Sequence, residues 1–191
     1  MAVPVLPRQP LGNVFLICLT LALSVLVAPR AAQAATAAEI EVSVDAALER
    51  FRNEVKGAES FLSSASGLLV FPRVIKAGFG IGGEYGEGAL RVGGSTEAYY
   101  RTTGASIGFQ LGAQSRTIII AFMEDAALET FRTSRGWEVG VDGSVALINL
   151  GAGADLTTTN IRDPIVGFVF GNRGLMYNLT LEGTKVSRIE R

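Results

Sequence analysis

Eight glycines lie between residues 78 and 94, and this run constrains the fold of the chain more than any other feature. Glycine weakens an ordinary strand, because it adds backbone entropy to the unfolded chain and brings no side chain to pack. A period of two places Gly78, Gly80, Gly82, Gly86 and Gly88 on one face, and Phe79, Ile81, Tyr85 and Ala89 on the other. The first face is mostly bare backbone, which a second layer can approach closely, and the second face is largely apolar and aromatic. The run therefore predicts the core of a β-rich domain.

The composition excludes most catalytic and metal sites. The 191 residues contain no histidine, and the single cysteine, Cys18, lies in an apolar segment near the N-terminus. Catalysis by Ser-His-Asp or Cys-His pairs, zinc sites built from His or Cys, and structural disulfides all need residues that the chain lacks. Apolar residues make up 48% of the chain and charged residues 18%, which fits one compact globular domain. We expect no cofactor and no metal ion.

The first 34 residues have the pattern of an export signal. Arg8 precedes the apolar segment 11–28, and Ala32-Gln33-Ala34 forms a small-x-small cleavage site. The competing interpretation is a retained membrane anchor, since the apolar segment approaches the length needed to span a bilayer. Cleavage would leave residues 35–191 as the mature domain. That domain would carry 15 basic residues, because Arg8 and Arg30 are lost from 17, against 18 acidic ones. A general nucleic-acid binder would be strongly basic, so we expect no nucleic-acid partner.

An amphipathic helix is predicted to open the domain. Thr36 and Glu39 form a capping box at its start, and Gly57 ends it. Between them one apolar stripe recurs at spacings of three and four, made of Ile40, Val44, Leu48, Phe51 and Val55. The stripe could lie on a membrane or pack on a sheet. Membrane-surface helices usually carry a broadly basic polar face, which this one lacks, so the pattern favours core packing.

The rest of the chain is mostly strand, with short helices predicted at 58–65 and 124–132. Pro72 is expected to end a first short strand at 68–71, and Gly93-Gly94 to form a hairpin turn. Further strands are predicted at 104–114, 117–123, 137–150, 165–170 and 175–186, with a polar loop at 151–160. We therefore predict a single α+β domain. It should contain a twisted, largely antiparallel β-sheet or sandwich of seven or eight strands, an N-terminal amphipathic helix and short additional helices.

Two motifs that suggest enzymes lack the context that they need. Residues 78–83 match GxGxxG, but the following segment is acidic and turn- or strand-like, whereas a dinucleotide site needs a helix there. Residues 104–108 match GxSxG, but the nucleophile elbow requires a histidine base. The carboxylates Glu84, Glu87, Asp142 and Asp155 show no spacing that specifies an acid/base pair. We predict no enzyme and no catalytic residue.

Four ordered blocks of the chain carry a family resemblance. They are FPRVIKAGFGIGGEYGEGAL at 71–90, GASIGFQLGAQS at 104–115, GWEVGVDGSVAL at 136–147 and GFVFGNRGLMYNLTLEGTKV at 167–186. Together they resemble the SYLF domain, over the chain from about residue 46 to its end. The resemblance implies a lipid-binding module without a catalytic centre, whose fungal members also bind actin. Residues 35–191 are therefore interpreted as a SYLF-like lipid-binding domain.

The candidate lipid contacts are four cations. Arg73 and Lys76 lie between an apolar strand and the glycine run, where they could hold a lipid phosphate beside backbone N–H groups. The alternative is that both are solvated charges. Arg52 and Lys56, at the end of the first helix, could join the same patch. The first helix and the region of Arg73 and Lys76 are thus the predicted membrane contacts.

The predicted function is non-catalytic binding of anionic phospholipid headgroups in a bacterial cell envelope. The export signal predicts the periplasm, the outer envelope or the exterior as the location, where membrane phospholipid is available and cytosolic actin is not. We therefore expect phospholipid as a partner and no actin binding. Two alternatives remain open: a structural outer-membrane β-barrel, which glycine and aromatic alternation also suits, and a protein-interaction domain without lipid specificity.

Overall fold

The structure is a computed structural model that describes residues 34–150, 156, 163–174 and 183–191, without the side chains of residues 80 and 106–111. Residues 1–33 of the predicted export signal lie outside the described residues. So do most of the predicted loop 151–160 and the first part of the predicted strand 175–186. The fold below is that of the compact unit Ala35–Arg191.

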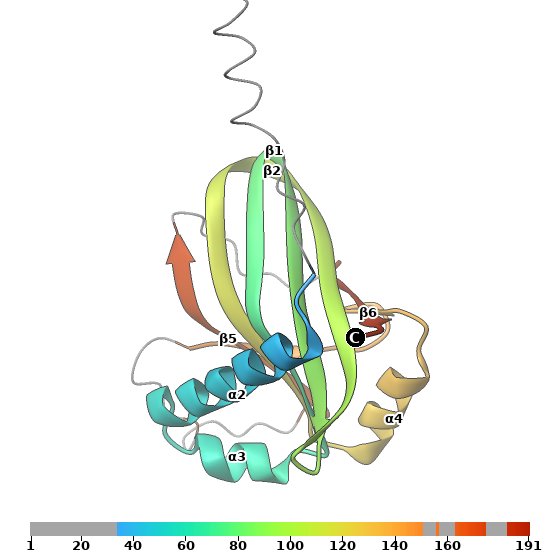
Figure 1. Ribbon diagram of the computed structural model, residues 1–191. Coiled ribbons are helices and arrows are strands. Elements are labelled where there is room, and N and C mark those ends of the chain that lie inside the picture. Colours follow the sequence, from blue (N-terminus) through green and yellow to red (C-terminus); the bar gives the residue numbers. More distant parts are fainter. Residues whose placement is uncertain (1–33, 151–155, 157–162, 175–182) are drawn as a thin grey trace, which may run out of the picture. The chain divides into compact units, whose positions relative to one another are not determined.

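The unit is a single α+β domain, as predicted (Figure 1). Its described helices are α2 (Ala37–Glu54), α3 (Ala58–Ser64) and α4 (Asp125–Thr133). Its described strands are β1 (Gly67–Val92), β2 (Ser95–Phe122), β3 (Trp137–Glu138), β4 (Ala146–Asn149), β5 (Ile165–Gly174) and β6 (Lys185–Ile189). The sheet has the order β3-β6-β2-β5-β4, and β1 pairs with β2. Between these described strands, every pairing is antiparallel except that of β4 with β5.

Strands β1 and β2 are far longer than predicted, with 26 and 28 residues. Pro72 does not end a strand. It lies in a register shift between Phe71 and Val74, where regular pairing with β2 is interrupted. Proline fits there, because the sheet does not require an N–H group at that position. Gly93 and Gly94 join the two strands with φ values of 55° and 83°, which confirms the predicted hairpin turn. Both strands fold over near their midpoints, at the end of the sheet farthest from the helices (Figure 1).

The glycine face of β1 allows another part of the sheet to approach closely, as the sequence predicts. A Cβ atom on Gly88 would lie 1.9 Å from the carbonyl oxygen of Val70, and one on Gly86 would lie 2.9 Å from that of Arg73. Bare backbone therefore lets the second half of β1 pack directly on the first half. The prediction for the opposite face is wrong at three positions, because Phe79, Ile81 and Tyr85 are exposed and only Ala89 is buried. Phe79 and Ile81 lie at the bend of β1, where no described element covers them.

In the part of the chain that the structure describes, apolar side chains gather in two clusters of buried residues. In one cluster α2 and α3 pack on β5, with the rings of Phe51 and Phe168 5.0 Å apart. The other cluster contains Phe122, Phe131 and Trp137. The capping box of Thr36 and Glu39 forms at the start of α2, and the predicted apolar stripe is buried. The stripe therefore packs on the sheet. This is the alternative that the sequence favoured, because the polar face of the helix is not broadly basic.

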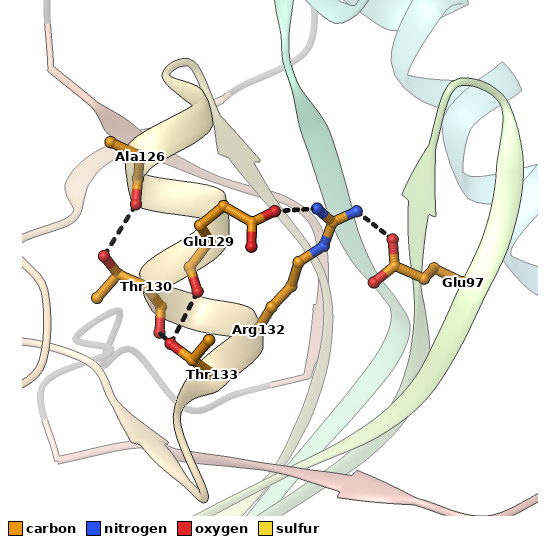
Figure 2. A network of polar contacts seen from close by, with 6 residues as sticks. All are labelled: Glu97, Ala126, Glu129, Thr130, Arg132 and Thr133. Carbon is orange, nitrogen blue, oxygen red and sulfur yellow. Dashed lines mark hydrogen bonds and ion pairs between the residues drawn. The ribbon is translucent and has the colours of Figure 1, made fainter.

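Helix α4 is fixed to β2 by apolar contacts and by charged contacts, and Figure 2 shows the charged ones. The ring centroid of Phe131 lies 4.9 Å from that of Phe122. Arg132 pairs with Glu129 on its own helix and with Glu97 on β2. Hydrogen bonds first to Glu97 and then to Glu129 raise the pKa of Arg132. Among the described residues, no helix has the length and apolar character that crossing a membrane requires.

Candidate functional site

A shallow hollow of ≈ 460 Å³ lies across three strands at the end of the sheet where β5 stops. We call it the two-arginine hollow. It is lined by Arg73 and Ile75 from β1, by Ala113, Gln114 and Ser115 from β2, and by Arg173 and Gly174 from β5.

Strand register brings these residues together from distant parts of the chain. Ile75 is paired with Ser115, which is paired in turn with Arg173, so the three form one row across β1, β2 and β5. Gly174 has a φ of 121°, and a Cβ atom there would lie 2.3 Å from the carbonyl oxygen of Ala113. Only glycine therefore allows β5 to approach β2 this closely at the edge of the hollow.

The hollow is positively charged, and no carboxylate of the described residues forms an ion pair with its arginines. Arg73 and Arg173 are both exposed, and neither forms an ion pair within the described part of the chain. By contrast, Arg91 and Arg132 each bind carboxylates of their own chain. A guanidinium group presents a planar fork of donors that suits a phosphate or a carboxylate. With the hydroxyl group of Ser115 between them, the two arginines can hold an anionic group.

Lys76 lies on the other side of the sheet from Arg73. Its exposed fraction is 4%, whereas Arg73 is exposed, because positions three apart in a strand point to opposite faces. Lys76 is paired in register with Gln114, two residues from Arg116. Arg116 forms a buried ion pair of 2.5 Å with Glu84. The structure therefore separates the two predicted headgroup contacts and places Lys76 in a buried polar region.

Arg52 lines a different hollow, of ≈ 590 Å³, between α2, α3 and the turn that joins β1 to β2. We call it the helix hollow, and it shares no lining residue with the two-arginine hollow. Its charges are compensated, because Arg52 pairs with Glu59 at 2.6 Å and Arg91 pairs with Asp45 at 2.5 Å. A further carboxylate, that of Glu49, also lines it. The helix hollow is thus less suited to an anion.

Lys56 is exposed in the short connection between α2 and α3. Its backbone carbonyl accepts a hydrogen bond of 2.9 Å from the N–H group of Leu156. Contact of Arg52, Lys56, Arg73 or Lys76 with lipid stays a prediction.

Arg173 is the site residue that the sequence analysis missed. It lies in the fourth block of the family resemblance, as GNRG at 171–174, so a charged residue between two glycines was visible there. Its proximity to Arg73 depends on the pairing of β2 with both β1 and β5, which links positions 100 residues apart. A pattern within one segment carries no information on such a pairing.

Three of the four carboxylates for which the sequence specifies no acid/base pair form ion pairs or hydrogen bonds within the fold. Glu84 pairs with Arg116, Glu87 pairs with Arg191, and Asp142 accepts the N–H group of Glu138 at 2.7 Å. Asp155 lies outside the described residues. No group of three or more His, Cys, Asp or Glu side chains suited to a metal ion occurs in the described ranges.

Comparison with known proteins finds a family model that matches part of the chain. Residues 103–190 match the model of the Ysc84 family, described as Las17-binding protein actin regulator. A comparison with curated proteins finds no match. The matched segment runs from Thr103 in β2 through α4 to β6, so it includes Ser115 and Arg173. Members of this family are lipid- or actin-binding modules. This match over residues 103–190 confirms the resemblance to the Ysc84, or SYLF, domain family that the sequence carries.

Proposed function

We propose that this domain binds anionic membrane phospholipid, without catalysis, through the two-arginine hollow. One observation carries the proposal. Arg73 and Arg173 come from separate strands to one hollow, and neither is neutralised by a carboxylate of the described chain. Two fork-shaped cations on one hollow match the oxygens of a phosphate group.

The surroundings of the two arginines favour a lipid over a free phosphate. Ile75 lies in the same hollow with 47% of its surface exposed, so an apolar group is available beside the cations. The chain as a whole carries a net charge of −1, so diffuse attraction to an anionic surface is absent. Binding should therefore depend on this local positive site.

The proposed location is the bacterial envelope, and it rests on the export signal predicted at residues 1–34. Phospholipid headgroups are available there, whereas cytosolic actin is not. Lipid is therefore the ligand that we propose from the two that the family binds.

Vesicle flotation of residues 35–191 tests this function. The buried core residues that the structure describes lie between Ile40 and Val186, so residues 35–191 contain both described core clusters. Binding to vesicles of phosphatidylglycerol and phosphatidylcholine should exceed binding to phosphatidylcholine alone, and salt should weaken it. Replacing Arg73 and Arg173 together by alanine should lower the affinity about 30-fold, since each cation near an anionic surface contributes about 1 kcal/mol.

The matched control replaces two other exposed arginines, Arg135 and Arg188, neither of which forms an ion pair in the described residues. This variant changes the net charge by the same amount, so its affinity should stay within a few-fold of the wild type. Equal losses in both variants would mean that charge alone, and not the hollow, governs binding. Two soluble competitors separate a headgroup site from a site for any free phosphate: glycerophosphoglycerol, the headgroup of phosphatidylglycerol, should displace the domain from vesicles, and inorganic phosphate should not.

A further inference from the structure

The bend of β1 exposes the largest apolar side chains on the described surface. Phe79 is 82% exposed and Ile81 is 71% exposed. Two more exposed apolar or aromatic side chains, Ile75 and Tyr85, lie on the same strand. We call residues 79–81 the β1 tip.

Glycine makes the tip protrude. A Cβ atom on Gly78 would lie 2.5 Å from the Cα atom of Gly82, so the chain doubles back sharply between these two residues. The backbone on both sides is held by the ladder, because Phe79 is paired with Leu111 and Ile81 with Ile107. The tip is thus a fixed projection of the sheet, with two apolar side chains directed into solvent.

The two-arginine hollow lies behind the tip on the same strand. Four residues separate Ile75, which lines the hollow, from Phe79, which corresponds to about 13 Å along a strand. Amphipathic helices at a membrane surface bury their apolar face about 5–10 Å into the boundary between headgroups and acyl chains, which gives the depth that an apolar tip needs to reach. An apolar tip followed by two cations therefore matches the order of layers that an anionic bilayer presents.

We propose that the β1 tip inserts into the bilayer while the two-arginine hollow holds a headgroup, an inference that rests on the proposed function. Phe79 and Ile81 supply the apolar contact, and Arg73 with Arg173 supplies the charge contact. A second copy of the chain is a poorer occupant. A stable dimer needs roughly 800 Å² of surface from each partner, which four side chains on one strand cannot provide.

Fluorescence can locate the tip in the membrane directly. The chain has a single tryptophan, Trp137, which is 1% exposed and gives a constant background. In residues 35–191 with Phe79→Trp, we expect a blue shift with anionic vesicles and strong quenching by lipids brominated near the top of the acyl chain. The matched control is Val42→Trp on α2, where Val42 is 71% exposed and remote from the tip in sequence. It should be neither shifted nor quenched.

Affinity separates this inference from the proposed function. Phe79→Ser with Ile81→Ser should weaken vesicle binding at least tenfold, whereas Val42→Ser with Val141→Ser, at sites 71% and 73% exposed, should not. Suppose that the arginine variant loses binding, but the tip variant binds like the wild type and the Phe79→Trp variant is not quenched. The tip inference is then overturned and the proposed function stands. If the wild type binds no anionic vesicle, both are overturned.

A second inference, carried by other contacts, concerns the first residue of the domain. The backbone N–H group of Ala35 donates a hydrogen bond of 3.2 Å to Oε2 of Glu87. The other oxygen of Glu87 accepts from the hydroxyl group of Tyr85, at 2.5 Å, and from the guanidinium group of Arg191. The side chain of Glu87 is only 8% exposed. One partly buried carboxylate thus binds residues near both ends of the unit.

We infer that a peptidase cleaves the bond between Ala34 and Ala35, and that Glu87 then binds the new α-amino group. Hydrolysis adds one water across this bond, which gives a carboxylate on Ala34 and a protonated amine on Ala35. The contact to Glu87 would change from a neutral hydrogen bond to a charge-assisted one, which is stronger. The sequence Ala32-Gln33-Ala34 and the position of Glu87 point independently to the same bond.

Two measurements test this inference. Intact mass spectrometry of the chain exported from a bacterial host should give the mass of residues 35–191. Glu87→Gln should then lower the melting temperature more in a chain that begins at Ala35 than in one that begins at Ala32, because only the first places an ammonium group beside Glu87. A different first residue, or equal losses in the two chains, would overturn the inference.

Discussion

At the scale of single residues, a missing side chain decides how closely β1 packs on itself. Gly88 lies so near the carbonyl group of Val70 that no Cβ atom fits between them. Gly83, five residues away on the same strand, has open space where a Cβ atom would be. Glycines in one run therefore have different roles, and substitution can separate them.

Gly88→Ala should destabilise the domain by about 1–3 kcal/mol or more, because a backbone atom must move to admit the new methyl group. Gly83→Ala is the matched control and should be neutral or slightly stabilising. Urea denaturation of both variants measures the difference. Equal stabilities would show that the halves of β1 do not pack as described.

The start of α2 gives a prediction on pH. Hydrogen bonds from Thr36, first from its backbone and then from its side chain, lower the pKa of Glu39. A lowered pKa in the folded state stabilises the fold above the unfolded pKa, and this contribution is lost as the pH falls through the folded value. Glu39→Gln should therefore reduce stability near neutral pH and match the wild type in strong acid.

Thr36→Ala removes the cap itself and should cost about 1 kcal/mol. Chemical denaturation at two pH values checks this variant together with Glu39→Gln. A loss that is the same at both pH values for Glu39→Gln would contradict the role of its charge.

At the scale of elements, the sequence predicts local structure better than strand length. Capping residues and apolar spacing are local signals, so α2, the short helices and the Gly93-Gly94 turn could be predicted. The prediction that Pro72 ends a strand was wrong, because proline interrupts a regular central strand but fits a register shift. That shift depends on the partner strand. The prediction that Phe79 faces the core was wrong for a similar reason. Alternation shows which face of a strand a residue is on but not what covers that face.

The buried pair of Arg116 and Glu84 joins the halves of the hairpin that do not pair with each other. Glu84 is paired with Gly104, whereas Arg116 is paired with Val74. Arg116→Met should cost about 3–5 kcal/mol, because it leaves the carboxylate of Glu84 buried with its main partner removed. Arg116→Met with Glu84→Gln should recover part of that loss. Thermal and urea denaturation report both, and a double variant as unstable as the single one would contradict the account.

At the scale of the whole domain, the helices and the proposed membrane contacts lie in different places. Helix α2 buries its apolar stripe in the core, so the described sheet, and not the helix, offers the exposed apolar side chains Phe79 and Ile81. Arg73 could be proposed from the sequence because it stands beside the glycine run. Arg173 could not, because only the pairing of β5 with β2 brings it to the same hollow.

Hydrogen–deuterium exchange of residues 35–191 with anionic and with neutral vesicles is the most direct test of lipid binding through this hollow. Anionic vesicles should slow exchange at 73–81, 113–115 and 172–174, and leave α2 and α3 unchanged. Neutral vesicles should change none of these segments. Slower exchange confined to α2 and α3, or no change with anionic vesicles, would contradict the account.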